Sequence, residues 1–416
     1  MANRLKKPEI LAPAGNLEKL KIAIDFGADA VYLGGNKLDL RAFSNNFSNE
    51  EMIEGIKYCH DRNKKVYVTL NVFARNYDLK GAGEYIKGLS DMGVDAILIA
   101  DPSLIAIAKE VAPDLDIHLS AQANTVNWVA TKFWYDMGVK RVVLAKELTF
   151  REINNITKNI PEGCEIESFV HGSMCIAYSG RCLISNYMLG RDANKEMCSN
   201  GCGYKYHLVE ETRPGEYYPI IEDDNGTYIM NSKDLCMIHY IPELVQSGID
   251  SLKIEGRMKS EFYVASVVKA YREALDSYFE DPEHFVFKEE WMDILNKVRH
   301  RQYHTGFFLG RSGEQNYEDQ SYTGDYEIVG IVKEYDEETK QAIILQKNRV
   351  FENDEVEVLR PNTPYFKIKI TDMYDVDKNV KTDAANRAHM IFKAKVDVPM
   401  KKNDMLVKSN KTYSVQ

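Results

Sequence analysis

The sequence predicts an α/β chain made of a closed parallel (β/α)8 barrel and a small C-terminal antiparallel β-barrel domain. Three observations predict this architecture. Eight short β-rich segments alternate with segments of helical hydrophobic spacing between residues 9 and 280. The connection after the seventh segment is long and rich in Cys. From residue 326 onward, short alternating runs typical of antiparallel strands replace the helical spacing.

The eight β-rich segments account for the barrel. They lie at residues 9–13, 29–35, 65–71, 95–101, 116–120, 141–145, 165–170 and 251–255. Several begin directly after a Gly that would end the preceding helix in the left-handed conformation, namely Gly27, Gly93, Gly138 and Gly248. The count of eight and the polar residues at the segment ends favour a TIM-like barrel over an open doubly wound sheet.

The chain divides into two predicted domains. Residues 1–300 form the barrel, with a Cys-rich insertion at about 171–231, and residues 325–416 form the β-domain after a linker at 301–324. Loops between strands and helices usually span about 2 to 6 residues. An insertion this long on a compact barrel therefore indicates a functional segment.

Composition and charge exclude several classes of protein. The 416 residues are 44% hydrophobic and 28% charged, which is typical of a globular protein. No apolar run reaches the roughly 18 residues of a membrane helix, so we expect a cytoplasmic protein with no membrane partner. A net charge of -10 argues against basic charge over the whole surface. Residues 361–416 nevertheless hold 11 Lys and Arg against 6 Asp and Glu.

Four of the seven Cys residues cluster in the insertion. They are Cys175, Cys182, Cys198 and Cys202, with six, fifteen and three residues between successive members. Four thiolates from one segment suit an iron-sulfur cluster or zinc. Structural zinc sites usually have two to four residues between paired ligands, so an iron-sulfur cluster is favoured over zinc. Cys59, Cys164 and Cys236 stand in regular segments and are expected to be buried core residues.

Several separated motifs resemble one known family. Residues 167–175 read Glu-Ser-Phe-Val-His-Gly-Ser-Met-Cys, and Cys182 follows in the pattern Ser-Gly-Arg-Cys. Together with residues 11–15, 27–35, 119–124 and 252–257, this pattern is similar to the collagenase-like peptidase family of unassigned catalytic type. The resemblance covers the whole barrel, and the C-terminal β-domain resembles the family's usual appendage.

The resemblance implies several activities. Family members hydroxylate the wobble uridine of tRNA to 5-hydroxyuridine with prephenate as hydroxyl source, hydroxylate a cytidine of ribosomal RNA, or take part in ubiquinone hydroxylation. Others were named collagenases. In the ubiquinone proteins, four cysteines of similar order hold a four-iron four-sulfur cluster (4Fe-4S). The length and single C-terminal domain look most like the tRNA-hydroxylating members, particularly the second of the paired versions in Gram-positive bacteria.

Two other functions stay open. A peptidase is one, but the chain contains neither a His-Glu-x-x-His nor a Gly-x-Ser-x-Gly motif. His171 and Cys175 could form a nucleophile pair, although three clustered cysteines would then have no role. The other is a non-catalytic electron-transfer protein working with a redox partner.

Barrel enzymes carry their functional groups at the carboxyl ends of the strands. Lys253, Glu255 and Arg257 alternate along the last segment, so we expect three charged side chains on its inward face. A small dicarboxylate such as prephenate would suit Arg side chains. The predicted catalytic residues are His171, Glu255 and Arg257, and the predicted substrate-binding residues are Arg41, Gln122, Arg181 and Lys253. For each residue, the alternative is a hydrogen bond that merely holds a strand end.

The basic tail predicts an RNA contact surface. The candidate residues are Lys367, Lys369, Lys393, Lys395, Lys401, Lys402 and also Lys408. Lysines two positions apart on a strand share one face, and phosphate contacts provide affinity without sequence information. The alternative is an ordinary solvated β-surface.

Overall fold

The computed structural model describes residues 6–35, 38, 47–174, 221–223, 226–228, 233–310 and 324–409. Within them, eight parallel strands close into a barrel, because β11 pairs with both β1 and β7. The barrel strands are β1 (Glu9–Pro13), β2 (Ala30–Gly34), β3 (Lys65–Leu70), β4 (Ala96–Ile99), β5 (Asp116–Leu119), β6 (Arg141–Val143), β7 (Glu165–Ser173) and β11 (Ser251–Ile254). The predicted (β/α)8 barrel is confirmed.

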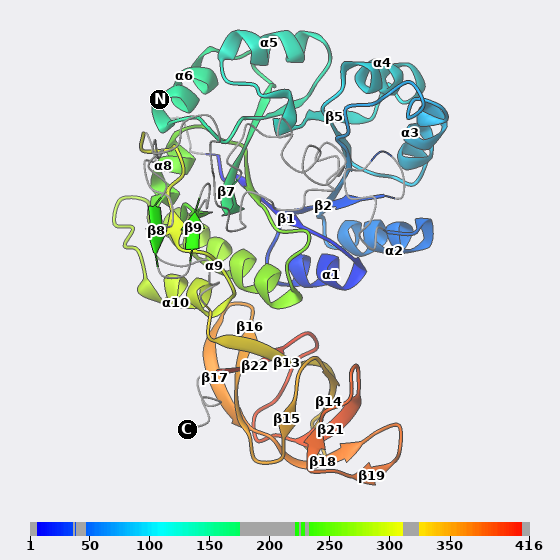
Figure 1. Ribbon diagram of the computed structural model, residues 1–416, viewed down its shortest axis with the longest axis vertical. Helices are drawn as coiled ribbons and strands as arrows, with labels where there is room; N and C mark the ends of the chain where they lie inside the picture. The colour runs from blue at the N-terminus through cyan, green and yellow to red at the C-terminus, as the bar shows by residue number, and fades with distance from the viewer. Residues whose placement is uncertain are drawn as a thin grey trace, which may run out of the picture.

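Helices surround the barrel (Figure 1). The α-helices described are α1 (Leu17–Asp25), α2 (Asn49–His60), α3 (Ala82–Asp91), α4 (Pro102–Val111), α5 (Trp128–Asp136), α6 (Phe150–Asn159), α8 (Ile241–Gln246), α9 (Glu261–Glu280) and α10 (Glu289–Lys297). The 3₁₀ turns η1 (Ala121–Ala123) and η4 (Ile238–Tyr240) follow β5 and precede α8. The glycines predicted to end helices, Gly27, Gly93, Gly138 and Gly248, all have positive φ. None of the described helices has the length and apolarity needed to cross a membrane.

Two hydrophobic clusters pack on opposite sides of the strands. The larger one joins the outward faces of the strands to the helices and contains Cys59 and Cys236. A small cluster inside the barrel includes Tyr32, Tyr67 and Leu98. Cys59, Cys164 and Cys236 are buried free thiols, which confirms the prediction for these three. Burial raises the pKa of each thiol.

Strand β7 continues beyond the barrel and forms a small extension of the sheet. β10 (Asp234–Cys236) pairs antiparallel with the end of β7, and β12 (Tyr303–His304) pairs with β10. The predicted linker at 301–324 therefore begins with residues that belong to the barrel sheet. The strands β8 (Ile221–Asp223) and β9 (Gly226–Tyr228) form a separate hairpin within the insertion.

The C-terminal domain is an antiparallel sheet whose strands follow the order β17-β16-β22-β13-β14-β21-β18-β19. Its elements are β13 (Tyr326–Asp336), β14 (Gln341–Gln346), β15 (Val350–Phe351), β16 (Glu355–Arg360), β17 (Thr363–Lys369), β18 (Thr371–Asp375), β19 (Val380–Lys381), β20 (Ala384–Ala385), β21 (Ile391–Lys395) and β22 (Met405–Ser409). β15 and β20 form a separate pair. The predicted antiparallel strands are confirmed, whereas the described pairings do not join β17 to β19 as a closed barrel would.

The C-terminal domain packs below the barrel against its helices (Figure 1). Ile331, Leu359 and Met405 belong to the same hydrophobic cluster as α9. Lys333 and Lys347 bind the Glu18 carboxylate of α1 at 2.9 and 3.0 Å. These contacts join the two domains through both apolar packing and ion pairs.

Candidate functional site

A cavity of about 50 Å³, lined by both charged and apolar side chains, lies at the carboxyl ends of the barrel strands. It is lined by Tyr32, Thr69, Asn71, Leu98, Ser120, Ala121, Phe169, Lys253, Glu255 and Arg257. Here it is called the mouth cavity. Since a cavity needs roughly 10–15 Å³ of volume measured in this way to hold one water molecule, the mouth cavity has room for only a few waters and is the floor of a site rather than a complete pocket for a small molecule.

The mouth cavity brings together three of the predicted site residues. Lys253 is buried on β11, where the predicted inward direction places it. The expected alternation of three residues along one strand is wrong, because β11 ends at Ile254 and a turn follows. Glu255 and Arg257 lie in this turn and reach the same cavity. The Arg257 guanidinium donates a hydrogen bond to Thr69 Oγ1 at 2.9 Å.

Two glycines allow the turn after β11 to approach the other strand ends. A Cβ atom on Gly15 would lie 2.2 Å from the Arg257 carbonyl oxygen. A Cβ atom on Gly172 would lie 2.5 Å from the Glu255 carbonyl oxygen, and Gly172 also has a φ of +109°. Neither position can hold a larger residue without moving backbone. Both glycines belong to motifs that carry the family resemblance, and close backbone packing at the mouth explains their presence.

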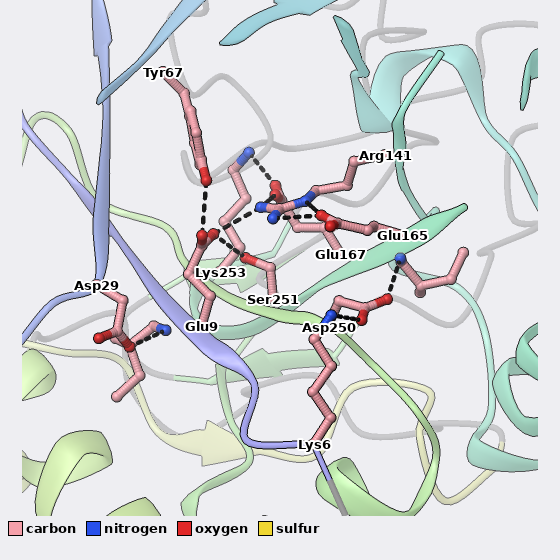
Figure 2. Close-up of polar contacts among 12 residues, drawn as sticks. Lys6, Glu9, Asp29, Tyr67, Arg141, Glu165, Glu167, Asp250, Ser251 and Lys253 are labelled. Atoms are coloured by element: carbon pink, nitrogen blue, oxygen red, sulfur yellow. Dashed lines mark hydrogen bonds and ion pairs between the residues drawn. The ribbon is translucent and has the colours of Figure 1, made fainter. Parts of the chain in front are cut away.

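A chain of buried ion pairs fills the barrel below the mouth cavity (Figure 2). Arg141 Nη1 lies 2.7 Å from Glu9 and 3.3 Å from Glu167, and Arg141 Nη2 lies 2.7 Å from Glu165. Glu167 also binds the Lys253 ammonium at 2.7 Å. The surrounding carboxylates raise the pKa of Arg141 although burial alone would lower it. Sequence reasoning missed Arg141 and Glu167, although charged residues in short buried strands signal a need for partners.

His171 lies against the helical layer instead of the mouth cavity. The pairing of β7 with β11 shifts register before His171, which stands opposite Ile254. Its ring contacts the rings of Tyr263, Tyr271 and Tyr303. Both ring nitrogens are buried without a hydrogen-bond partner among the described residues. The structure therefore does not bring His171 together with the cavity-facing side chains of Glu255 and Arg257, and its catalytic role stays a prediction.

Replacing His171 with Phe is expected to reduce the acid sensitivity of the fold. Burial lowers the pKa of His171 to about 3. The unfolded chain binds this proton below about pH 6.5, so the histidine makes the wild type lose stability as pH falls from about 6.5 toward 3. Between pH 7 and pH 4 the wild type should lose about 3 kcal/mol more than the variant, as measured by urea unfolding. The exposed His239 provides a control, since His239→Phe should behave like wild type. Equal acid sensitivity of His171→Phe and wild type would contradict the prediction.

Gln122 is the remaining predicted substrate-binding residue that the structure describes. Gln122 is buried in η1 and accepts a hydrogen bond from Ser120 Oγ at 3.0 Å, beside the mouth cavity. The predicted site residues that lie outside the described ranges are Arg41, Arg181, Cys175, Cys182, Cys198 and Cys202. Among the described residues, no group of His, Cys, Asp and Glu is arranged to hold a metal ion.

The predicted RNA-binding lysines are distributed over separate parts of the C-terminal sheet. Lys367 and Lys369 share the exposed face of β17, as predicted, but stand opposite Glu357 and Glu355 of β16. Lys408 pairs with Asp354 at 2.8 Å. The remaining candidates are Lys393 and Lys395 on β21 and Lys401 and Lys402 before β22.

Lys393 and Lys395 have uncharged neighbours at the directly opposite positions. Ile343 and Gln341 of β14 stand on one side of them. Tyr374 and Thr371 of β18 stand on the other side. Five steps in the strand order separate β21 from β17, so these two pairs of lysines stand on strands that are not neighbours in the sheet.

A larger cavity of about 970 Å³ lies between α9, α10 and the C-terminal domain. Its lining includes Trp291, Tyr326 and Tyr365, with more carboxylates than ammonium groups. The Lys297 ammonium lies over the rings of Tyr326 and Tyr365. This negatively charged lining does not suit a polyanion such as RNA.

A closed parallel barrel with charged side chains at its carboxyl mouth defines an α/β-barrel protein with its candidate site in the usual place. Residues 15–318 match the model of peptidase family U32, and residues 324–406 match the model of the family's C-terminal domain. The chain belongs to peptidase family U32. The predicted resemblance to collagenase-like peptidases is thereby confirmed.

Three relatives match most of the chain. tRNA hydroxylation protein P1 of Bacillus subtilis is 43% identical over 405 residues, which cover 97% of this chain and 95% of the relative. tRNA hydroxylation protein P of Escherichia coli is 38% identical over 85% of this chain and 86% of the relative. tRNA hydroxylation protein P2 of B. subtilis is 36% identical over 73% of this chain and 98% of the relative. Identity and coverage are higher for P1 than for P2, so the expected likeness to the second paired version is wrong.

Proposed function

We propose that this protein is an enzyme that hydroxylates the wobble uridine of tRNA to 5-hydroxyuridine and takes the hydroxyl group from prephenate. The observation that carries the proposal is the 43% identity to tRNA hydroxylation protein P1 over 97% of this chain. The cations at the mouth cavity support it, since prephenate is a dicarboxylate.

In this proposal the mouth cavity receives the small anion. Arg257 offers a guanidinium that can bind a carboxylate through two donors, and Lys253 offers a compact ammonium. Glu255 lies beside both and is the proposed proton-transfer group. Arg41, Gln122 and Arg181 are proposed to complete the binding of substrate around this floor.

Nucleoside mass spectrometry of tRNA tests the proposal. A strain that lacks the gene and any redundant homologue should lose 5-hydroxyuridine and its derivatives, and the wild-type gene should restore them. An Arg257→Met gene expressed at the wild-type level should fail to restore them. Retention of 5-hydroxyuridine in the deletion strain would overturn the proposal.

We further propose that Cys175, Cys182, Cys198 and Cys202 hold an iron-sulfur cluster, with four irons and four sulfides as the favoured composition and zinc as the less favoured occupant. Four thiolates within 28 residues form a suitable donor set. Their segment begins directly after Met174, which is buried at the end of β7. When bound, such a cluster would supply electron transfer, and a redox partner protein would then exchange electrons with it.

Replacing Cys198 with Ser should remove the cluster. Anaerobically purified wild type should be brown and contain iron and acid-labile sulfide, whereas the variant should be nearly colourless. The buried Cys59 provides the control, since Cys59→Ser should keep the colour. Colourless wild-type protein containing one equivalent of zinc would show that zinc is the metal.

We propose that the C-terminal domain contacts tRNA phosphates through its lysines. Lys393 and Lys395 stand opposite uncharged residues, whereas Lys367 and Lys369 stand opposite carboxylates. We therefore expect Lys393 and Lys395 to contribute more to tRNA affinity. Replacing Lys393 and Lys395 with Ala should weaken tRNA binding and lower its salt dependence by about one unit per lost contact. The matched pair Lys367→Ala and Lys369→Ala should change both quantities less. Equal effects of the two pairs of substitutions would show that the carboxylates of β16 do not weaken the contribution of Lys367 and Lys369 to tRNA binding.

Peptidase activity is the second candidate function, since the family models carry the peptidase name. Incubation of the purified protein with denatured collagen and casein tests it. Cleavage that persists in Cys175→Ser would argue against the nucleophile pair of Cys175 and His171. Loss of cleavage in that variant, with normal tRNA modification in the deletion strain, would favour the peptidase.

A further inference from the structure

The side chain of Glu167 is fully buried inside the barrel, directly below the mouth cavity. One carboxylate oxygen accepts a hydrogen bond from Lys253 Nζ at 2.7 Å, and the other lies 3.3 Å from Arg141 Nη1. Glu167 therefore joins the cavity floor to the ion pairs deeper in the barrel (Figure 2). Its carboxylate is the link between Lys253 and the rest of this network.

Arg141 is well supplied with negative charge without Glu167. It forms shorter contacts, of 2.7 Å each, with Glu9 and Glu165. Lys253, in contrast, has a single carboxylate partner among the described residues, because the ion pair that it forms there is with Glu167. Loss of the Glu167 charge would consequently affect Lys253 more than Arg141.

The Lys253 ammonium is also held from the sides. It lies 4.5 Å from the ring centre of Tyr32 and 5.3 Å from that of Phe169. Both rings line the mouth cavity together with Lys253. The cation–π contacts restrict the sideways position of the Lys253 ammonium, and the Glu167 carboxylate restricts how far the ammonium extends into the mouth cavity.

We infer that Glu167 is a positioning residue that holds the Lys253 ammonium at the floor of the mouth cavity, where the ammonium receives a carboxylate of the small-molecule substrate. An ordered cation binds a carboxylate with less loss of side-chain freedom than a mobile one. The inference deepens the proposed function and depends on it for the activity measurement. It concerns substrate binding, so the Michaelis constant for the small anion should change more than the turnover number.

The experiment compares Glu167→Gln with Glu165→Gln, Lys253→Met and the double variant Glu167→Gln/Lys253→Met. Glu165 touches the same Arg141 but not Lys253, so it is the matched control. Hydroxylation of tRNA is measured at varied prephenate concentration, with thermal unfolding of each variant. Glu167→Gln should raise the KM for prephenate about 10-fold or more with a smaller change in kcat. Glu165→Gln should stay within about 3-fold of wild type, and the double variant should equal Lys253→Met alone.

A second measurement does not need activity. Proton-detected ¹⁵N spectra of labelled lysine ammonium groups should show a protected Lys253 signal in wild type, identified by its loss in Lys253→Met. The signal should be lost or broadened in Glu167→Gln and kept in Glu165→Gln. An unchanged signal in folded Glu167→Gln would overturn the inference, as would additive effects of the two substitutions on KM. If wild type fails to hydroxylate tRNA while the signal behaves as expected, the proposed function fails and the positioning of Lys253 stands.

Discussion

Replacing Arg141 with Met is expected to lower the free energy of unfolding by about 3 to 5 kcal/mol, as is typical when one partner of a buried ion pair is removed. Glu9, Glu165 and Glu167 would lose the guanidinium that they share. Glu9 would keep hydrogen bonds from Tyr67 and Ser251, and Glu167 would keep Lys253. These remaining partners cannot replace the lost charge. Urea unfolding followed by circular dichroism measures the effect.

A surface ion pair of the same barrel is the control for Arg141. Lys6 binds Asp250 at 2.7 Å, but its side chain is 70% exposed. Lys6→Met should therefore cost less than about 1 kcal/mol. A loss of similar size in Arg141→Met would show that the interior network contributes no more than an exposed pair. The pH should be held constant in both measurements, because burial acts to raise the pKa of Glu165 and Arg141 holds that pKa below its ordinary value.

Replacing Gly15 with Ala is expected to lower the proposed tRNA hydroxylation about 100-fold, since displacements of about 1 Å at a reacting site can have effects of this size. The added methyl group would overlap the Arg257 carbonyl oxygen, and neither backbone segment is a flexible side chain that can turn away. The turn from Glu255 to Arg257 must then move, and the hydrogen bond from Arg257 to Thr69 would be broken or lengthened. Steady-state hydroxylation of tRNA measures the loss.

Gly88 in α3 is the matched control for Gly15. A Cβ atom there would meet nothing within 4 Å, so Gly88→Ala should leave activity unchanged and stabilise the helix by up to about 1 kcal/mol. Amide hydrogen exchange reports on the turn independently of activity, and exchange at residues 255–258 should increase in Gly15→Ala alone. Wild-type exchange and activity in Gly15→Ala would mean that the backbone adapts without affecting the site.

Local signals in the sequence predicted much of the fold. Short stretches of sequence were enough to predict three features. These are the eight barrel segments, the glycines that end helices and the change to antiparallel strands after residue 326. Each depends on interactions within a few residues, such as hydrophobic periodicity and backbone conformation. The inward direction of Lys253 was also readable, because alternation along a strand is a local property.

Other features depend on which strands pair with each other, and short stretches of sequence do not contain that information. The pairing of β10 and β12 with β7 depends on where the chain returns after the insertion, and the register shift before His171 depends on packing between β7 and β11. The carboxylates opposite Lys367 and Lys369 come from another strand, so the charge of the tail by itself did not reveal them.

The sequence by itself determined the class of fold, the division into two domains, the four clustered cysteines and the family motifs. Only the tertiary structure decided which charged side chains meet. Lys253 and Glu167 are 86 positions apart, and Arg141 and Glu9 are 132 positions apart. Local periodicity sets the direction of a side chain relative to its own strand, but closure of the barrel brings distant strands together. Burial then requires opposite charges to pair, because an isolated charge in the interior is too costly.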